Sequence, residues 1–111
     1  MAELMMHELP VTDRIKLGGP LTVRTVKPIG VRLLEAVRQF PRVTIDCSGA
    51  TEVDLSFLQL VMSARKSAAD AGKTLSLAHP ASGILLERLM QAGLVAPANE
   101  QPAADQTFWL N

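Results

Sequence analysis

Side chains that could do chemistry gather in residues 43–60, which read VTIDCSGATEVDLSFLQL. Asp46 ends a short β-branched run, and Asp54 and Ser56 stand where an apolar helical pattern begins. Backbone amides at a helix start lack intrahelical acceptors, so a carboxylate or hydroxyl there can cap the helix. A serine at such a position can also carry a phosphate, because helix N-termini favour anions. The pattern therefore predicts a helix cap, a modifiable hydroxyl, or both.

Catalytic and metal-binding patterns are missing from the chain. It has one cysteine, Cys47, and two widely separated histidines, His7 and His79, with no CxxC or Cys/His metal spacing. The Walker, GxGxxG, GxSxG and HExxH motifs are absent. A thiol nucleophile needs a histidine base, and nothing in the spacing places one beside Cys47. We therefore predict no catalytic residue, no metal site and no cofactor, with Cys47 buried at the end of a strand.

Length, composition and charge narrow the class of protein. With 111 residues the chain makes one domain, and its 48% hydrophobic and 20% charged residues are typical of a globular protein. Eleven basic residues balance eleven acidic ones and are scattered along the chain, so we expect no nucleic-acid partner. No apolar run is long enough to span a membrane, and the N-terminus lacks the basic start of a signal peptide. We therefore expect a cytoplasmic location without direct membrane insertion.

Alternating and helical apolar patterns predict the elements that hold these residues. Gly18-Gly19-Pro20 is expected to turn a hairpin between two strands, and Gly72 and Gly93 are expected to end helices. The expected strands are residues 14–17, 21–23, 43–46 and 74–78, and the expected helices begin near Pro28, Ser56 and Ser82, with a loop at 47–51. This ββαβαβα order predicts an α/β fold with a mixed, mostly parallel sheet of four to five strands covered by helices.

Composition also suggests how the chain is divided. We expect an N-terminal extension at 1–12, the domain at 13–95, and a flexible connector with a strand-like terminal segment at 96–111. Residues 107–110 would dock this segment on the sheet as a strand, anchored by Trp109, the only tryptophan. We expect a monomer or weak homodimer.

The ordered set of motifs resembles the STAS family, named for sulphate transporters and anti-sigma-factor antagonists. The resemblance runs from about Ile15 to Leu94. It rests on four pieces: the Leu17–Val23 opening, the Ile45–Gly49 strand and loop, the Gly72–Leu75 strand start, and the Leu89–Leu94 helix end. Together they imply a STAS-like single domain.

The resemblance implies a switch at Ser56. In anti-sigma antagonists the corresponding loop reads Asp-Ser-Ser-Gly and its second serine is phosphorylated; Asp54, Leu55, Ser56 and Phe57 occupy those places. Leu55 and Phe57 depart from the pattern, and the loss of the glycine makes the loop bulkier and stiffer. The implied partner-binding surface contains Asp54, Leu55, Ser56, Phe57 and Leu58, together with Asp46 and Ser48.

The implied function is that of a bacterial phosphoprotein in signal transduction and transcription regulation, acting by protein–protein interaction. Its partners would be an anti-sigma factor or serine kinase of the histidine-kinase-like ATPase class, and a cognate serine phosphatase. Other readings stay open. The chain could be a STAS subunit of a lipid-transporting ABC assembly, docked constitutively on the ATPase, or a chemosensory adaptor. A third option is a small-molecule sensor or enzyme, which a deep ordered pocket lined by Asp46, Asp54 and Ser56 would favour.

Purely structural roles also fit the same residues. Ser56 and Gln59 match an S-x-x-Q capping box, and Asp54 alone matches a helix N-cap. Asp46 at a strand end typically accepts hydrogen bonds from the amides of the loop that follows. Phe57 is expected in the core. Because Phe57 and Leu58 lie on different sides of the helix, one of the two is expected to stay exposed beside Ser56.

Overall fold

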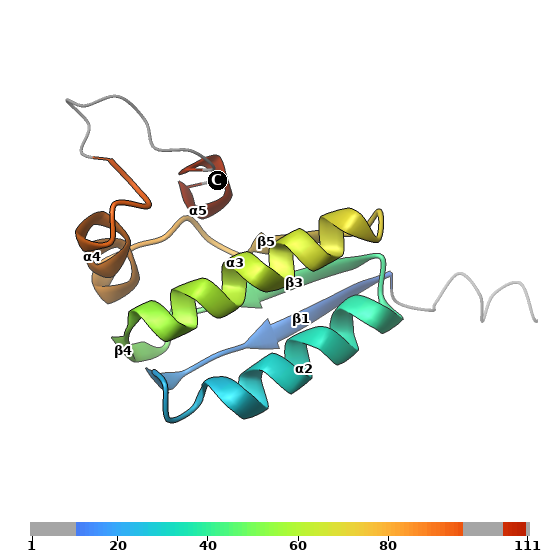
Figure 1. Ribbon diagram of the computed structural model, residues 1–111, viewed down its shortest axis with the longest axis horizontal. Helices are drawn as coiled ribbons and strands as arrows, with labels where there is room; N and C mark the ends of the chain where they lie inside the picture. The colour runs from blue at the N-terminus through green and yellow to red at the C-terminus, as the bar shows by residue number, and fades with distance from the viewer. Residues whose placement is uncertain (1–10, 97–105, 111) are drawn as a thin grey trace, which may run out of the picture.

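Figure 1 shows a computed structural model of the chain, which describes residues 11–96 and 106–110. Strands and helices alternate in the order expected from the sequence, apart from one additional strand and a terminal helix. The strands are β1 (Thr12–Lys16), β2 (Gly19–Leu21), β3 (Arg42–Asp46), β4 (Ala50–Val53) and β5 (Thr74–Leu77). The helices are α2 (Val26–Gln39), α3 (Leu55–Asp70), α4 (Gly83–Gln91) and α5 (Gln106–Leu110).

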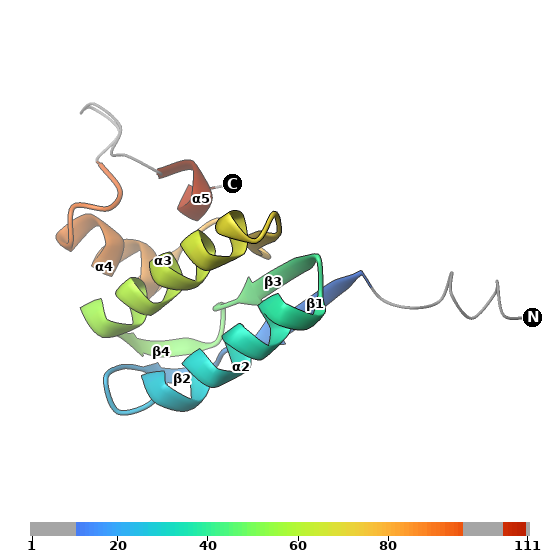
Figure 2. The same cartoon turned by 45° about the vertical axis from the view of Figure 1, so that its right-hand side comes forward.

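Each strand pair within the described residues is parallel. β1, β3 and β5 form a three-stranded sheet with β3 in the centre, and β2 and β4 form a separate two-stranded sheet. Parallel neighbours need crossover connections, which α2 and α3 provide. The two helices run side by side along one face of the three-stranded sheet (Figures 1 and 2). This α/β arrangement confirms the fold class predicted from the sequence.

The predicted hairpin at Gly18-Gly19-Pro20 was wrong. The chain bends there instead of reversing, and β2 pairs with β4 in parallel. The amide of Leu17 donates a hydrogen bond to the Asp46 carbonyl at 2.8 Å, and the amide of Gly19 donates one to the Gly49 carbonyl at 3.0 Å. These bonds continue the parallel pairing across the bend. Gly19 has a φ of 71°, a conformation that glycine adopts readily. The expected loop at 47–51 is correspondingly shorter, because β4 begins at Ala50.

The core lies between the three-stranded sheet and the helices. Val43 and Ile45 on β3 are 1% and 0% exposed, and α2 and α3 cover them with Leu33 and Phe57, both fully buried. α2 and α3 approach closely at one point, where a Cβ on Gly30 would lie 3.2 Å from Cδ1 of Leu60. None of the helices in the described ranges is long and apolar enough to cross a membrane.

The two predicted helix ends are confirmed. The amide of Lys73 donates to the Ala68 carbonyl beyond Gly72, and the amide of Leu94 donates to the Leu89 carbonyl beyond Gly93. Both glycines have positive φ, so α3 and α4 end in the same glycine-terminated motif.

The C-terminal segment forms a helix instead of the expected strand. Residues 106–110 make the short helix α5, whose residue Trp109 is 2% exposed. The carbonyl of Trp109 accepts a hydrogen bond from the Ala81 amide at 2.7 Å, so the predicted anchoring role holds. A segment this short has no periodicity to separate helix from strand, and its tertiary contacts decide. Residues 97–105, most of the expected connector, lie outside the described residues. Residues 1–10 of the expected N-terminal extension also lie outside them.

Candidate functional site

Asp54 caps helix α3. Its Oδ1 accepts a hydrogen bond from the Phe57 amide at 3.2 Å, and its Oδ2 accepts one from the Val23 amide at 2.9 Å. Its own amide donates to the Leu21 carbonyl at 3.2 Å. One residue therefore caps α3 and ties its start to β2 and to the turn that leads into α2.

Ser56 is the second residue of α3 and does not cap it. Its side chain is half-buried and makes no hydrogen bond to any other residue that the structure describes. The S-x-x-Q capping box expected from Ser56 and Gln59 is therefore not formed, because Asp54 takes the N-cap position. Leu55, immediately before Ser56, is 54% exposed. A hydroxyl without a structural task thus lies beside an exposed aliphatic side chain.

Phe57 and Leu58 belong to the core. Their exposed fractions are 0% and 1%, so the expectation that one of them stays exposed was wrong. The buried arc of α3 is broad because the helix packs against both α2 and β5. Neither residue is accessible to a partner in this conformation. The exposed apolar contact beside Ser56 is Leu55.

Asp46 binds the loop that follows β3. Its Oδ1 accepts hydrogen bonds from the Ser48 hydroxyl at 2.6 Å and from the Ser48 amide at 3.0 Å, as expected for a strand-end aspartate. Arg14, on β1, approaches Oδ2 at 3.4 Å. These bonds, the Ser48 hydroxyl first, lower the pKa of Asp46 from 3.8 to about 2, so the group is ionised at neutral pH. Asp46 is 5% exposed, and among the described residues it is the one acidic residue that is buried.

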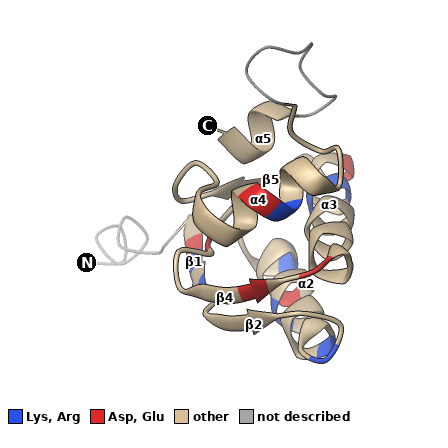
Figure 3. Cartoon of the chain, turned by 90° about the vertical axis from the view of Figure 1, so that its left-hand side faces the viewer, with Lys and Arg blue, Asp and Glu red and all other residues tan. Residues whose placement is uncertain are grey.

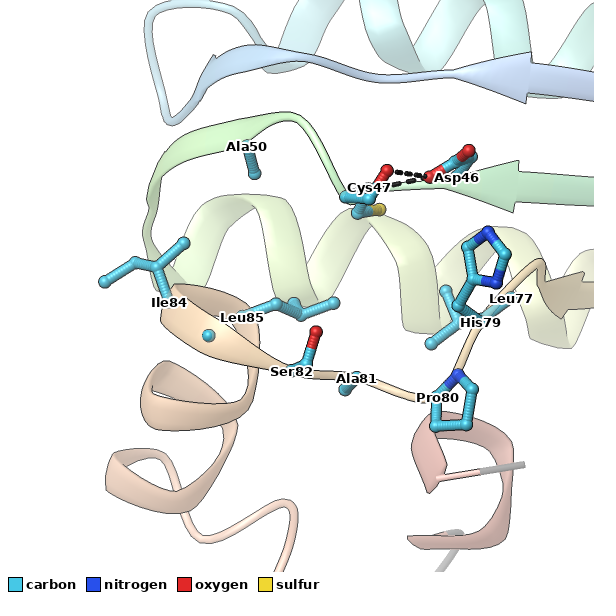
Figure 4. Close-up of a pocket in the computed structure, with 12 residues that line it drawn as sticks. Asp46, Cys47, Ala50, Leu77, His79, Pro80, Ala81, Ser82, Ile84 and Leu85 are labelled. Carbon is cyan, nitrogen blue, oxygen red and sulfur yellow. Dashed lines mark hydrogen bonds between the residues drawn. The ribbon is translucent and has the colours of Figure 1, made fainter.

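A cavity of about 140 Å³ opens beside Asp46, between the end of β3 and the start of α4 (Figure 4). Ser48, His79 and Ser82 contribute polar groups, while Leu77, Ile84 and Leu85 contribute apolar ones. Asp54 and Ser56 do not line it. Asp46 and Ser48 therefore lie at a different site from Ser56. A pocket lined by Asp46, Asp54 and Ser56 together, which would have favoured a sensor or enzyme, is not present among the described residues.

Cys47 also lines this cavity. Burial, followed by the negative charge of Asp46, raises the pKa of its thiol to about 12. The thiol is therefore protonated at neutral pH, which is the unreactive state. Among the residues described, no group of three or more histidine, cysteine or acidic side chains could hold a metal ion.

A separate groove of about 340 Å³ lies between the start of α3 and α4, and Ser56 does not line it. Leu55 and Leu58 line it from α3, and Arg88 and Gln91 line it from α4. The Nε of Arg88 donates to the Val53 carbonyl at 3.2 Å, which fixes α4 against the end of β4. Sequence reasoning missed Arg88 and the Val23 amide, because both act through contacts more than thirty residues apart in the chain.

Comparison with known proteins identifies the family. A family model described as "Mlab, STAS domain" matches residues 5–96, and the chain belongs to the STAS domain family. No curated protein and no solved structure gives a significant match. Membership supports a regulatory or binding module in general, since STAS domains are generally non-catalytic binding modules. The family therefore directs attention to surfaces.

Proposed function

We propose that this chain is a non-catalytic regulatory module whose partner binds around Ser56, and that phosphorylation of Ser56 ends the complex, as in an anti-sigma-factor antagonist. The observation that carries the proposal is the geometry of Ser56. Its hydroxyl stands at the second position of α3 without a hydrogen-bond partner among the described residues, while Asp54 caps the helix. The fold does not need this hydroxyl, so modification of it is compatible with an intact domain.

The helix start also favours the modified state. A phosphate adds roughly −1.5 to −2 charges, and the unpaired amides and dipole of a helix N-terminus stabilise such charge. The Phe57 amide is already used by Asp54, which leaves the amides of Leu55 and Ser56 without intrahelical acceptors. Asp54 and Glu52 carry negative charge nearby in the chain. A partner that tolerates the neutral hydroxyl would therefore meet a strongly acidic surface after phosphorylation.

The partner would use the exposed surface next to Ser56. Leu55 supplies an apolar contact, and the groove between α3 and α4 continues from it toward Arg88. The partner class that we propose is an anti-sigma factor or a serine kinase of the histidine-kinase-like ATPase class, in the cytoplasm of a bacterium. A serine phosphatase would restore the hydroxyl.

A second candidate function is favoured by Leu55. An aliphatic side chain that is 54% exposed stands where the antagonist pattern has serine, and such a side chain suits a permanent apolar contact. In this candidate the same surface docks constitutively on the ATPase of a lipid-transporting ABC assembly, and Ser56 stays unmodified.

Capture from an extract of the native source tests the proposal. The tagged chain, Ser56→Ala and Ser56→Glu are compared, and the bound proteins are identified and quantified by mass spectrometry. The matched control is Ala69→Glu, which adds the same charge at an exposed position near the end of α3. We expect a soluble kinase or anti-sigma factor on wild type, Ser56→Ala and Ala69→Glu, and its loss on Ser56→Glu.

Two results would decide against the phosphorylation switch. Retention of the partner on Ser56→Glu would show that negative charge at this position does not end the complex. Recovery of a transporter ATPase on all four proteins would select the constitutive docking function instead. Circular dichroism of each variant ensures that a lost complex does not reflect a lost fold.

A further inference from the structure

The outer face of α2 carries exposed apolar side chains between two cations. Lys27, Val31, Leu34 and Arg38 follow the spacing i, i+4, i+7, i+11 and therefore share one face of the helix. Val31 is 54% exposed and Leu34 is 44% exposed. Exposed apolar side chains rimmed by charged ones are typical of contact surfaces. These four residues are called the α2 stripe below.

The charge around the α2 stripe is one-sided. Residues 24–42 contain five basic residues, namely Arg24, Lys27, Arg32, Arg38 and Arg42, and one acidic residue, Glu35. Arg32 is engaged by Asp13 at 2.9 Å, whereas Lys27 and Arg38 form no ion pair within the described ranges. Figure 3 shows basic positions on α2, while β4 carries an acidic one. Charge complementarity therefore favours a partner with an acidic surface.

The stripe begins at the level of Ser56. α2 and α3 run parallel and side by side (Figures 1 and 2), and they meet where Gly30 faces Leu60. Lys27 on α2 and Ser56 on α3 each lie about one helical turn before this contact, toward the N-terminus of their helix. The basic start of the stripe and the proposed phosphorylation site therefore share one end of the helix pair.

We propose that the α2 stripe docks an acidic amphipathic helix of a partner protein. Two apolar side chains of that helix pack on Val31 and Leu34, and carboxylates one turn to either side meet Lys27 and Arg38. One further step rests on the proposed function: a phosphate on Ser56 places negative charge beside Lys27 and repels the acidic helix. Regulation at Ser56 thereby reaches a surface on the neighbouring helix.

Two other occupants fit the stripe less well. In a second copy related by a twofold axis, antiparallel stripes would set Lys27 against Arg38, and parallel stripes would set each cation against itself. Like charges so placed oppose association. A membrane surface is usually bound through a broad apolar face that includes aromatic residues, whereas the stripe offers two aliphatic side chains and no aromatic one. A protein helix of matching narrow width suits it better.

A synthetic peptide provides the probe. It carries two leucines one turn apart, with a glutamate one turn to either side, on an alanine–glutamine helix, and a matched peptide has lysines in place of the glutamates. Binding to the full chain is followed by the amide shifts of the isotope-labelled protein. We expect the acidic peptide to shift the amides of residues 27–38, and the Lys27→Glu/Arg38→Glu double variant to bind it roughly tenfold more weakly. The double variant should bind the lysine peptide instead.

Matched controls separate this inference from the proposed function. Lys66→Glu, an exposed charge reversal on α3, should leave peptide binding unchanged, and Ser56→Glu should weaken it while Ser56→Ala does not. Equal binding of both peptides, or shifts spread away from the stripe, would overturn the docking surface whatever happens at Ser56. Shifts at the stripe caused by phosphatidylglycerol vesicles and not by the peptide would also overturn it. Normal peptide binding to Ser56→Glu would overturn the coupling and leave the stripe intact.

Discussion

The carboxylate of Asp54 accepts a hydrogen bond from the backbone amide of Val23, which lies 31 residues earlier in the chain, at 2.9 Å. The same carboxylate caps α3 through the Phe57 amide. A single side chain thus fixes the start of α3 relative to the turn before α2, near Ser56 and the start of the α2 stripe. The position of Ser56 is set by its neighbour and does not depend on its own hydroxyl.

Replacement of Asp54 should therefore destabilise the domain more than replacement of Ser56. Asp54→Ala removes a helix cap and leaves the Val23 amide without its acceptor, so we expect a loss of about 1–2 kcal/mol in the free energy of unfolding. Ser56→Ala should change it by less than about 0.5 kcal/mol. Urea unfolding followed by circular dichroism measures both. Equal losses in the two variants would contradict the assignment of the cap to Asp54.

The contact between Gly30 and Leu60 should limit the size of residue 30. A Cβ at this position meets the flexible end of Leu60 at 3.2 Å, and alanine also favours the helix by roughly 0.5–1 kcal/mol relative to glycine. Gly30→Ala should therefore be close to neutral. Gly30→Leu should force α2 and α3 apart and cost about 1–3 kcal/mol. Thermal unfolding of the two variants against wild type checks this order, and a stable Gly30→Leu would refute the close helix contact.

Asp46 should make the fold sensitive to acid. Its pKa is lowered from 3.8 to about 2 in the folded chain, so the ionised group stabilises the fold above its ordinary pKa. This contribution is lost as the pH falls from about 3.8 toward 2. Ser48→Ala removes the largest cause of the shift, and the carboxyl resonance of Asp46 should then titrate at a higher pH. In Asp46→Asn the free energy of unfolding should vary less over this range. An unchanged titration in Ser48→Ala would contradict the hydrogen bond at 2.6 Å.

Trp109 should contribute substantially to stability although it lies near the end of the chain. Its side chain is 2% exposed and its carbonyl accepts from Ala81, so Trp109→Ala should leave a large cavity and cost about 3–5 kcal/mol. Phe108→Ala, a neighbouring aromatic that is only half-buried, is the control and should cost less. Chemical denaturation measures both. If Trp109→Ala loses less free energy of unfolding than Phe108→Ala, α5 is not anchored through Trp109.

The sequence predicted most of the fold because its helices and central strands have clear periodicity and glycine-marked ends. It failed at the Gly18–Gly19 bend, because two glycines and a proline suit a reversal as well as a bend, and the parallel partner that decides between them is distant in the chain. β4 was missed because it is short and two of its four residues are exposed. The terminal helix was missed because the packing of Trp109, and no local pattern, determines it.

The candidate site was predicted in part. Local patterns correctly placed Asp54 at the helix cap, Asp46 at the loop and Phe57 in the core. The burial of Leu58 could not be predicted from one helix, because it depends on the elements that pack around α3. The Val23–Asp54 bond and the level of Lys27 relative to Ser56 arise from the packing of α2 beside α3, which local sequence does not encode.

Phosphopeptide mapping of the chain purified from its native source, in growth and under stress, tests the proposed switch at Ser56 directly. We expect a phosphate on the peptide that contains Ser56 in at least one condition, with the other serines unmodified. A chain that carries no phosphate in any condition, or carries it only on serines elsewhere, would contradict the regulatory role given to this hydroxyl.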